Sequence, residues 1–285
     1  MKILIIGKGY LGIRCTKTWE KDNQVILSDK KIEIVQDVEK LINEHSPDVL
    51  LSAAGVVGRP NVDWCETHPM ETIKGNTVLP IIIAEACKNK NIYMLHMATG
   101  CAFYGKSSHD GPWTEEDYGN PEVVYTKSKF AVDLALSALP NVGIARVRML
   151  LDSKPHPANL LDKLSKYEKI IDVENSITIV DDMIDVFYQL LEKKAEGIFH
   201  VTNPGSIKHK EIMALYKKYV DPNHKNEWIK EDELVKLELV DKRRSSNILT
   251  SLNLPKFGIK MRPIKEAAED TIKKYAKNKN QLTKS

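Results

Sequence analysis

The sequence predicts an α/β fold in which a doubly wound parallel sheet is followed by a smaller C-terminal part. Short apolar runs alternate with helical stretches over the first 150 residues, a glycine-rich turn follows the first run, and the pattern loosens after Met149. The apolar runs are continuous instead of alternating, which is typical of strands buried on both faces. Strands that alternate with helices in this way predict a parallel sheet with helices on both faces.

The individual elements follow from the length and spacing of these runs. We expect strands at Ile3–Ile6, Val25–Ser28, Val49–Ser52, Ile92–Met97 and Ile144–Met149. Helical spacing covers Tyr10–Lys21, Asp37–His45, Thr72–Lys88 and Val124–Ala138. Beyond these, the pattern predicts a helix at Leu160–Tyr167, a strand at Ile177–Val180, a helix at Met183–Lys193 and a strand at Gly197–Thr202. The last three elements suggest a return to the sheet, whereas the residues that follow are more polar and helical.

Composition excludes several classes of protein. The chain has 285 residues, 42% of them hydrophobic, and its 42 Lys and Arg against 39 Asp and Glu give a net charge of +3. This mix is that of a globular protein without the broad positive field that nucleic-acid binding needs. The apolar runs are too short for a secretory signal or a membrane span. The four cysteines form no CxxC pair and no HExxH motif occurs, so we expect a cytoplasmic protein without a catalytic metal.

The first strand runs into a GxGxxG motif, Gly7-Lys8-Gly9-Tyr10-Leu11-Gly12, at the start of a helix. Glycines there permit a tight turn and let backbone N–H groups approach a diphosphate at the helix N-terminus. Asp29 ends the next strand, about 20 residues on, where a carboxylate accepts a hydrogen bond from a ribose 2′-OH. Lys30 and Lys31 can instead neutralise a 2′-phosphate, so the pattern predicts NADH or NADPH and leaves the choice open. The alternative is a structural glycine turn beside a capping aspartate.

The change of pattern after Met149 predicts how the chain is divided. We expect a dinucleotide-binding domain over residues 1–150, with a return to the sheet at about 174–202, and a substrate-binding part over 151–173 and 203–285. A cleft between two such parts is a common place for ligands.

Three side chains are candidates for acid–base chemistry. Tyr125 and Lys129 are four residues apart on a predicted helix and share a face, whereas Lys127 points away. A tyrosine has a pKa of about 10, and a nearby ammonium lowers such a pKa by roughly 1–3, so we expect the phenol to exchange a proton near neutral pH. Thr99 lies just beyond the strand Ile92–Met97, where its hydroxyl can hold a substrate carbonyl beside Tyr125.

Thr99, Tyr125 and Lys129, in this order after a Rossmann loop, resemble the catalytic set of the extended short-chain dehydrogenase/reductases, which bind nucleotide-sugars. Three segments narrow the resemblance: AAGVVGRPNVDWCE at residues 53–66, ATGC at 98–101 and TNPG at 202–205. They look like the bifunctional 3,5-epimerase/4-reductases that complete UDP-L-rhamnose synthesis. The chain is similar, more distantly, to the dTDP-4-dehydrorhamnose reductases, which lack an obvious counterpart of Cys101. The similarity covers residues 1 to about 275.

The resemblance implies roles for further residues. Epimerisation beside a ketone removes a proton from one face of the sugar and returns one on the other, so two acid–base groups are needed. These would be Cys101 and Lys163. Ala53, Ala54, Gly55 and Asn76 would line the cofactor with the glycine loop, Tyr125 and Lys129. The sugar nucleotide would contact Arg59, Asn61, Val62, Thr99, Met149 and Arg244.

The resemblance also implies the reaction and the partners. The expected activity is conversion of UDP-4-keto-6-deoxy-D-glucose to UDP-L-rhamnose with NADPH or NADH. We expect an upstream 4,6-dehydratase to supply the keto sugar, and a homodimer formed through the helices Thr72–Lys88 and Val124–Ala138. The first alternative is a monofunctional 4-reductase acting on a dTDP- or UDP-sugar. The second is a non-catalytic, dinucleotide-binding regulatory subunit, such as the β subunit of methionine adenosyltransferase, which resembles the same reductases.

Overall fold

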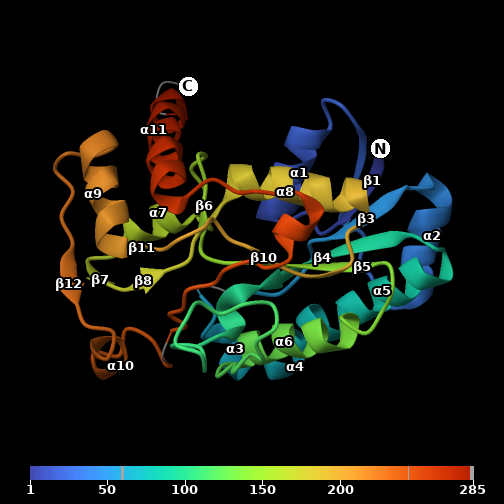
Figure 1. The fold of residues 1–285 in the computed structure, drawn as a ribbon, viewed down its shortest axis with the longest axis horizontal. Coiled ribbons are helices and arrows are strands. Elements are labelled where there is room, and N and C mark those ends of the chain that lie inside the picture. Colours follow the sequence, from blue (N-terminus) through green and yellow to red (C-terminus); the bar gives the residue numbers. More distant parts are fainter. Residues whose placement is uncertain (59–60, 243, 283–285) are drawn as a thin grey trace.

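The computed structural model describes residues 1–58, 61–242 and 244–282, and the described strands include one parallel sheet of six. Its order is β10-β5-β4-β3-β1-β2 (Figure 1). The strands are β1 Lys2–Ile6, β2 Gln24–Ser28, β3 Val49–Ser52, β4 Tyr93–Thr99, β5 Val142–Val147 and β10 Gly197–Val201. The winding reverses between β1 and β3, and in such sheets ligands bind at the carboxyl ends of the strands beside this point. The loops after β1 and β3 are therefore the expected cofactor side.

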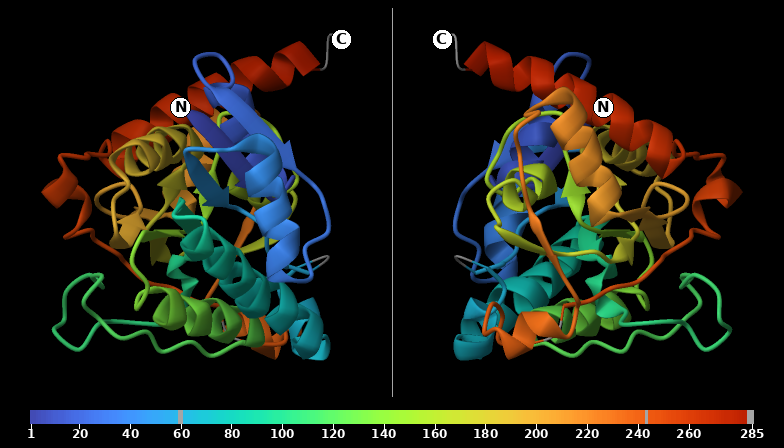
Figure 2. Two further views of the ribbon diagram at one scale, coloured as in Figure 1. Left: turned by 90° about the vertical axis from the view of Figure 1, so that its right-hand side faces the viewer. Right: turned by 90° about the vertical axis from the view of Figure 1, so that its left-hand side faces the viewer.

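Helices cover both faces of the sheet (Figure 1, Figure 2). They are α1 Tyr10–Trp19 and α8 Val180–Lys193 on one face, and α2 Val35–His45, α5 Leu79–Asn89 and α6 Val124–Leu136 on the other. In β1, Ile3 and Ile5 belong to the core under α1 and α8, whereas Leu4 and Ile6 belong to the opposite core. Burial on both faces explains why the strands are continuous apolar runs. The prediction of a doubly wound sheet is confirmed.

The C-terminal part has a core of its own, on the left of Figure 1. In it, Leu161, Ile212 and Ile272 from three helices pack together. Its short strands form three two-stranded sheets among the described residues, β6–β9, β7–β12 and β8–β11. The elements are β6 Leu150–Leu151, α7 Leu160–Leu164, β7 Lys169–Ile171, β8 Glu174–Asn175, β9 Thr178–Ile179, β11 Ile207–Lys208, α9 His209–Tyr219, β12 Glu227–Ile229, α10 Glu233–Lys236 and α11 Ile264–Leu282.

Two predicted elements of this region are wrong in detail. The segment Ile177–Val180 does not join the large sheet, because Thr178–Ile179 pairs with β6 and Val180 already begins α8. The helix expected at Leu160–Tyr167 ends at Leu164. The strand predicted at Gly197–Thr202 does return to the large sheet, as β10 beside β5.

The strand predicted at Ile144–Met149 is broken near its end. β5 stops at Val147, and Met149 has a φ of 41°, a left-handed conformation that ends an extended strand. The chain then continues as β6, and Met149 packs, partly buried, against the C-terminal core. The backbone turn at Met149 thus separates the large sheet from the smaller part.

The helix predicted at Thr72–Lys88 contains a π-helical turn. Short α3 (Trp64–Thr67) comes first, α4 spans Pro69–Ile73, the π-helical turn spans Lys74–Val78, and α5 continues to Asn89. Such turns are rare and are frequently found at functional sites. No described helix is both long and apolar enough to cross a membrane. The described residues also contain no group of three or more His, Cys, Asp or Glu side chains that could hold a metal ion.

Candidate active site

The turn after β1 is held by two glycines that pack against backbone. Gly7 has a φ of 120°, and a Cβ there would lie 2.4 Å from the backbone nitrogen of Ala54. At Gly12 a Cβ would lie 2.1 Å from the carbonyl oxygen of Gly7. At Gly9 it would meet nothing within 4 Å, and Gly9 is the N-cap residue of α1, which has no side-chain cap. The first N–H groups of α1 are left for a ligand, and this arrangement fits the diphosphate of a dinucleotide.

These contacts predict different outcomes for two alanine variants. Gly12→Ala is expected to destabilise the protein by about 1–3 kcal/mol, because the new methyl group collides with a backbone oxygen that cannot rotate away. Gly9→Ala is expected to leave the thermal unfolding midpoint unchanged but to weaken NADPH binding, because its methyl group enters open space where the diphosphate approaches. Thermal unfolding without ligand and a fluorescence titration with NADPH measure the two effects. Equal behaviour of the two variants would contradict this assignment.

Asp29 lies on the surface just after β2. Its carboxylate pairs with Lys8 Nζ at 3.0 Å, and this contact lowers the pKa of Asp29. Lys30 and Lys31 each pair with a glutamate, and all these side chains are exposed. Exposed ion pairs exchange easily with solvent or ligand. The structure therefore keeps a carboxylate and two ammonium groups near each other, so the choice between NADH and NADPH stays open.

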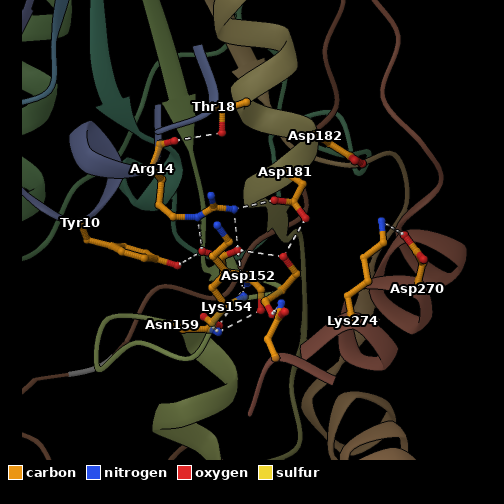
Figure 3. Close-up of polar contacts among 12 residues, drawn as sticks. Tyr10, Arg14, Thr18, Asp152, Lys154, Asn159, Asp181, Asp182, Asp270 and Lys274 are labelled. Carbon is orange, nitrogen blue, oxygen red and sulfur yellow. Dashed lines mark hydrogen bonds and ion pairs between the residues drawn. The ribbon is translucent and has the colours of Figure 1, made fainter. Parts of the chain in front are cut away.

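The side chain of Tyr10 belongs to a buried network between α1 and the C-terminal part (Figure 3). The phenol donates a hydrogen bond to Asp152, and the ring stacks on His156 with centroids 4.1 Å apart. Arg14 donates to both oxygens of Asp152, at 2.8 and 3.1 Å, and to Asp181 at 2.6 Å. Burial raises the pKa of Tyr10. Because the phenol is hydrogen-bonded in this network, the predicted contact of Tyr10 with the cofactor depends on its backbone.

Asn76 anchors the backbone that follows β3. Its side chain accepts a hydrogen bond from the N–H of Val56 and donates one to the carbonyl oxygen of Val56, both at 2.8 Å. Asn76 is fully buried in the π-helical turn. A Cβ on Gly55 would lie 3.1 Å from Asn76 Oδ1 and 3.2 Å from Lys129 Nζ. The segment Ala53–Gly55 thus passes close to both the glycine turn and the ammonium of Lys129.

The structure brings the three predicted acid–base residues together at the end of β4. Tyr125 lies on the first turn of α6, and this helix packs against β4, which ends at Thr99. One turn further on, Lys129 is buried and donates from Nζ to the carbonyl oxygen of Met97 at 3.3 Å. The i and i+4 spacing therefore places the phenol and the ammonium on the same side of α6.

The expected effect of Lys129 on Tyr125 is wrong. Burial raises the pKa of Tyr125, the neighbouring Cys101 adds to this, and the hydroxyl of Thr99 opposes it. Lys129 is itself removed from water, which lowers its pKa to about 8, while Asp133 opposes that shift. Desolvation disfavours the charged form of both groups and outweighs their attraction. The phenol is therefore a protonated donor, and Lys129 is the group that titrates near neutral pH.

Lys129→Met is expected to raise thermal stability. A lysine whose pKa is about 8 in the folded protein binds fewer protons than in the unfolded chain. The free-energy cost of burying the charged lysine is therefore greatest below about pH 8. It disappears as the pH rises toward about 10.4, the ordinary pKa of lysine. The variant should unfold at a higher temperature than the original protein at pH 7, by an amount that shrinks toward pH 10. Calorimetry across this range tests it, with the exposed Lys127→Met as control. A gain that grows with pH would contradict it.

Cys101 and Lys163 come from different parts of the chain. Cys101 is partly buried in the short turn after β4, and its N–H donates to Thr99 Oγ1 at 3.2 Å. Lys163 lies on the last turn of α7, a helix capped by Asn159, which accepts from the N–H of Leu161. Burial lowers the pKa of Lys163, and attraction to Cys101 opposes this.

Arg148 is a site residue that the sequence analysis missed. It is fully buried after β5, and its Nη1 donates to Cys101 Sγ at 3.1 Å. It also donates to Ser245 Oγ at 3.0 Å, to the Ser245 carbonyl oxygen at 2.6 Å and to Asn175 Oδ1 at 2.5 Å. The available signal was the pair Arg146 and Arg148 inside a run otherwise read as an apolar strand. Charged residues at that depth are retained only with specific partners.

Two of the residues expected to contact the sugar, Asn61 and Val62, lie on the segment before α3. Asn61 Oδ1 accepts from the N–H of Asp63 at 2.7 Å, and Val62 lies between these two residues. Arg244 makes two hydrogen bonds to the carboxylate of Asp63, both at 2.7 Å, so its guanidinium ties the two segments together. A grip of Arg244 on a diphosphate stays a prediction. Arg59 lies outside the described residues.

Comparison with known proteins identifies relatives over nearly the whole chain. Residues 1–277 match the family described as RmlD substrate binding domain. A trifunctional UDP-glucose 4,6-dehydratase/UDP-4-keto-6-deoxy-D-glucose 3,5-epimerase/UDP-4-keto-L-rhamnose-reductase of Arabidopsis thaliana is 33% identical over 99% of this chain, which spans 43% of that relative. A bifunctional dTDP-4-dehydrorhamnose 3,5-epimerase/dTDP-4-dehydrorhamnose reductase of the same plant is 38% identical over 69% of this chain and 66% of its own length. The chain thus spans less than half the length of the trifunctional relative.

Solved structures share the fold. The crystal structure of a UDP-rhamnose synthase from Acanthamoeba polyphaga mimivirus has a TM-score of 0.89 and 28% identity, covering 95% of this chain and 99% of that one. A dTDP-4-dehydrorhamnose reductase from Bacillus anthracis, in complex with NADP, has a TM-score of 0.78 over 96% of this chain and 98% of that one. At 20% identity, the second match shows the likeness of the fold alone.

Proposed function

The chain belongs to the RmlD substrate binding domain family, and on this premise we propose that it is a nucleotide-sugar 3,5-epimerase/4-reductase. The substrate is UDP-4-keto-6-deoxy-D-glucose, the product is UDP-L-rhamnose, and the reductant is NADPH or NADH. One observation carries this proposal: the N–H of Cys101 donates to Thr99 Oγ1 at 3.2 Å at the end of β4, and the helix that bears Tyr125 and Lys129 packs against this strand. In this proposal Cys101 is one acid–base group, and Lys163, on α7, supplies the second.

The reductase half needs a hydride donor and a proton donor at carbon 4. Bound NADPH or NADH would supply the hydride, and the glycine turn with Gly55, Asn76 and Lys129 would hold the dinucleotide. Tyr125 gives its proton to the carbonyl oxygen as the hydroxyl forms, and Thr99 keeps the phenol in place. Lys129, with a pKa lowered to about 8, can return a proton to Tyr125 near neutral pH.

The epimerase half uses the acidity of the hydrogens at carbons 3 and 5, which both adjoin the ketone. Removing either proton leaves an enolate, whose oxygen accepts hydrogen bonds from Tyr125 and Thr99. Cys101 lies beside Thr99 after β4, whereas Lys163 comes from α7 in the C-terminal part. Groups from separate parts of the chain suit removal of a proton on one face and its return on the other. The same oxyanion site therefore serves both halves of the reaction.

The names of the relatives support the choice of sugar. The mimivirus protein is called a UDP-rhamnose synthase, and the Arabidopsis relatives combine 3,5-epimerase and reductase activities. In the trifunctional relative a 4,6-dehydratase activity belongs to the same chain. We propose that an enzyme of this dehydratase class supplies the keto sugar here.

Exposed apolar side chains support a homodimer. Along α4, the π-helical turn and α5 they are Met70, Ile73, Val78 and Ile81, and α6 adds Leu134. The two helices α5 and α6 pack against each other on one face of the sheet. Covering these side chains with a second copy would remove apolar area from water. The molar mass in solution, measured by light scattering, tests this part of the proposal.

Incubation with UDP- or dTDP-4-keto-6-deoxyglucose and NADPH or NADH in D₂O, followed by NMR of the product, tests the function. We expect a rhamnose product with deuterium at carbons 3 and 5. Cys101→Ser should lose the deuterium exchange but still reduce a 4-keto-L-rhamnose nucleotide. A chain that reduces only the already epimerised sugar, without exchange, is a monofunctional reductase. Binding of dinucleotide without turnover of any keto sugar would instead favour the regulatory subunit.

A further inference from the structure

The buried guanidinium of Arg148 lies against the thiol of Cys101. We propose that Arg148 is a positioning residue that holds Cys101 in its thiolate form, which makes Cys101 the base and Lys163 the acid of the epimerisation. This inference rests on the proposed function and deepens it, because it assigns a direction to the proton transfers. The contact that carries it is the hydrogen bond from Arg148 Nη1 to Cys101 Sγ, at 3.1 Å.

Arg148 has no carboxylate partner among its described contacts. Its remaining hydrogen bonds go to neutral oxygens of Ser245 and Asn175, and its Nε is buried without a partner. Arg146, two residues earlier and equally buried, instead pairs with the carboxylate of Asp133. A buried cation is costly unless an anion accompanies it. Among the described partners of Arg148, the thiol of Cys101 is the group that can become an anion.

The electrostatics of the neighbouring groups agree with this. Burial lowers the pKa of Arg148, and Cys101 opposes this by attraction. Cys101 also attracts the ammonium of Lys163. A thiolate beside the guanidinium of Arg148 compensates its charge, whereas a neutral thiol would leave this buried cation without an anion among its described contacts.

The proton transfers then balance as follows. The thiolate of Cys101 takes the proton from carbon 3 or carbon 5, so that a C–H bond breaks, an S–H bond forms and the electron pair moves into the enolate. The ammonium of Lys163 gives a proton to the opposite face of the same carbon, so that an N–H bond breaks and a new C–H bond forms. Transfer of the proton from the thiol to the amine, directly or through water, restores the starting state.

The rate of alkylation by iodoacetamide, followed at Cys101 by peptide mapping from about pH 5 to 9, tests the protonation state. The other three cysteines are buried, so the reagent should reach Cys101 first. We expect Arg148→Met to slow alkylation at pH 7 about tenfold or more, because losing an adjacent opposite charge shifts an ionisation by about 1–3 pH units. Arg148→Lys keeps the charge and should recover part of the rate.

Arg146→Lys is the matched control, because it changes a buried arginine two residues earlier, which contacts Asp133 instead of Cys101. Its alkylation profile should follow that of the original protein. A profile for Arg148→Met that equals the original one, or an equal slowing in Arg146→Lys, would overturn the inference. If neither Arg148 variant folds, the pH profile of alkylation in the original protein alone tests the inference. Alkylation of the original protein that becomes fast only near about pH 8.5, as for an ordinary thiol, would overturn the inference.

Deuterium exchange at carbons 3 and 5 separates this inference from the proposed function. In the original protein, the rate of deuterium exchange should fall at low pH over the same range in which the rate of alkylation falls. Arg148→Lys should shift both pH profiles in the same direction. Exchange that persists while alkylation does not depend on Arg148 defeats the inference and leaves the function standing. Alkylation that depends on Arg148, in a protein that catalyses no exchange, supports the thiolate and defeats the epimerase function.

Discussion

Tyr125→Phe is expected to slow reduction of the 4-keto sugar by about 10²–10⁴-fold, the usual contribution of a positioned general acid. The variant removes one oxygen atom, the proton donor to the new hydroxyl. Burial raises the pKa of Tyr125, so the phenol is protonated throughout the working range and its loss cannot be compensated by a change of pH. Because the same oxygen supports the enolate, deuterium exchange at carbons 3 and 5 should also fall. Oxidation of NADPH and NMR of the product measure the two halves separately.

Tyr118→Phe is the matched control for this variant. Tyr118 is 72% exposed, and its ring makes an edge contact with Phe130. Removal of its hydroxyl should therefore leave both rates unchanged. Binding of NADPH to Tyr125→Phe should also persist, because the glycine turn is untouched. Turnover of the keto sugar by Tyr125→Phe at the original rate would contradict the proposed chemistry and point to a protein that only binds the dinucleotide.

Asp133→Ala is expected to lower the free energy of unfolding by about 3–5 kcal/mol, the typical cost of breaking a buried ion pair by removing one partner. Asp133 Oδ2 accepts from Arg146 Nε at 2.9 Å, and the two side chains are 1% and 2% exposed. The guanidinium also lies over the rings of Phe103 and Phe130, at 5.3 and 5.9 Å from their centroids. Without Asp133, it stays in this apolar site as an uncompensated charge. Urea unfolding of the protein measures the loss.

Two further variants separate the buried charge from a general effect of losing an aspartate. Asp232→Ala breaks an exposed pair with Lys236 and should change stability little. The double variant Asp133→Leu with Arg146→Met replaces both charges by apolar groups, and it should recover most of the stability lost in Asp133→Ala. If Asp133→Ala is as stable as the original protein, the pair does not hold α6 against β5.

Much of the fold could be predicted because it depends on interactions between residues close together in the chain. The continuous apolar runs predicted the strands of the large sheet, and the GxGxxG motif predicted the turn that Gly7 and Gly12 form. The i and i+4 spacing of Tyr125 and Lys129 predicted that they share one side of α6. Such patterns are visible in the sequence because a strand buried on both faces is a continuous apolar run, whereas a helix repeats every 3.6 residues.

The rest could not be predicted because it depends on contacts between distant segments. Ile177–Val180 has the composition of a strand in the large sheet, but pairing with β6 decides its place. The spacing of Tyr125 and Lys129 likewise predicted their proximity and not their protonation. Depth of burial sets the sign of both pKa shifts, and depth follows from the packing of the whole domain.

The sequence by itself determined the doubly wound sheet, the glycine turn and the residues of the acid–base pair. The tertiary structure alone decided that Arg148 donates a hydrogen bond to Cys101. Periodicity and short motifs record which face of an element is apolar. They do not show which distant side chains come into contact, because the packing of separate elements around a shared buried charge decides these contacts.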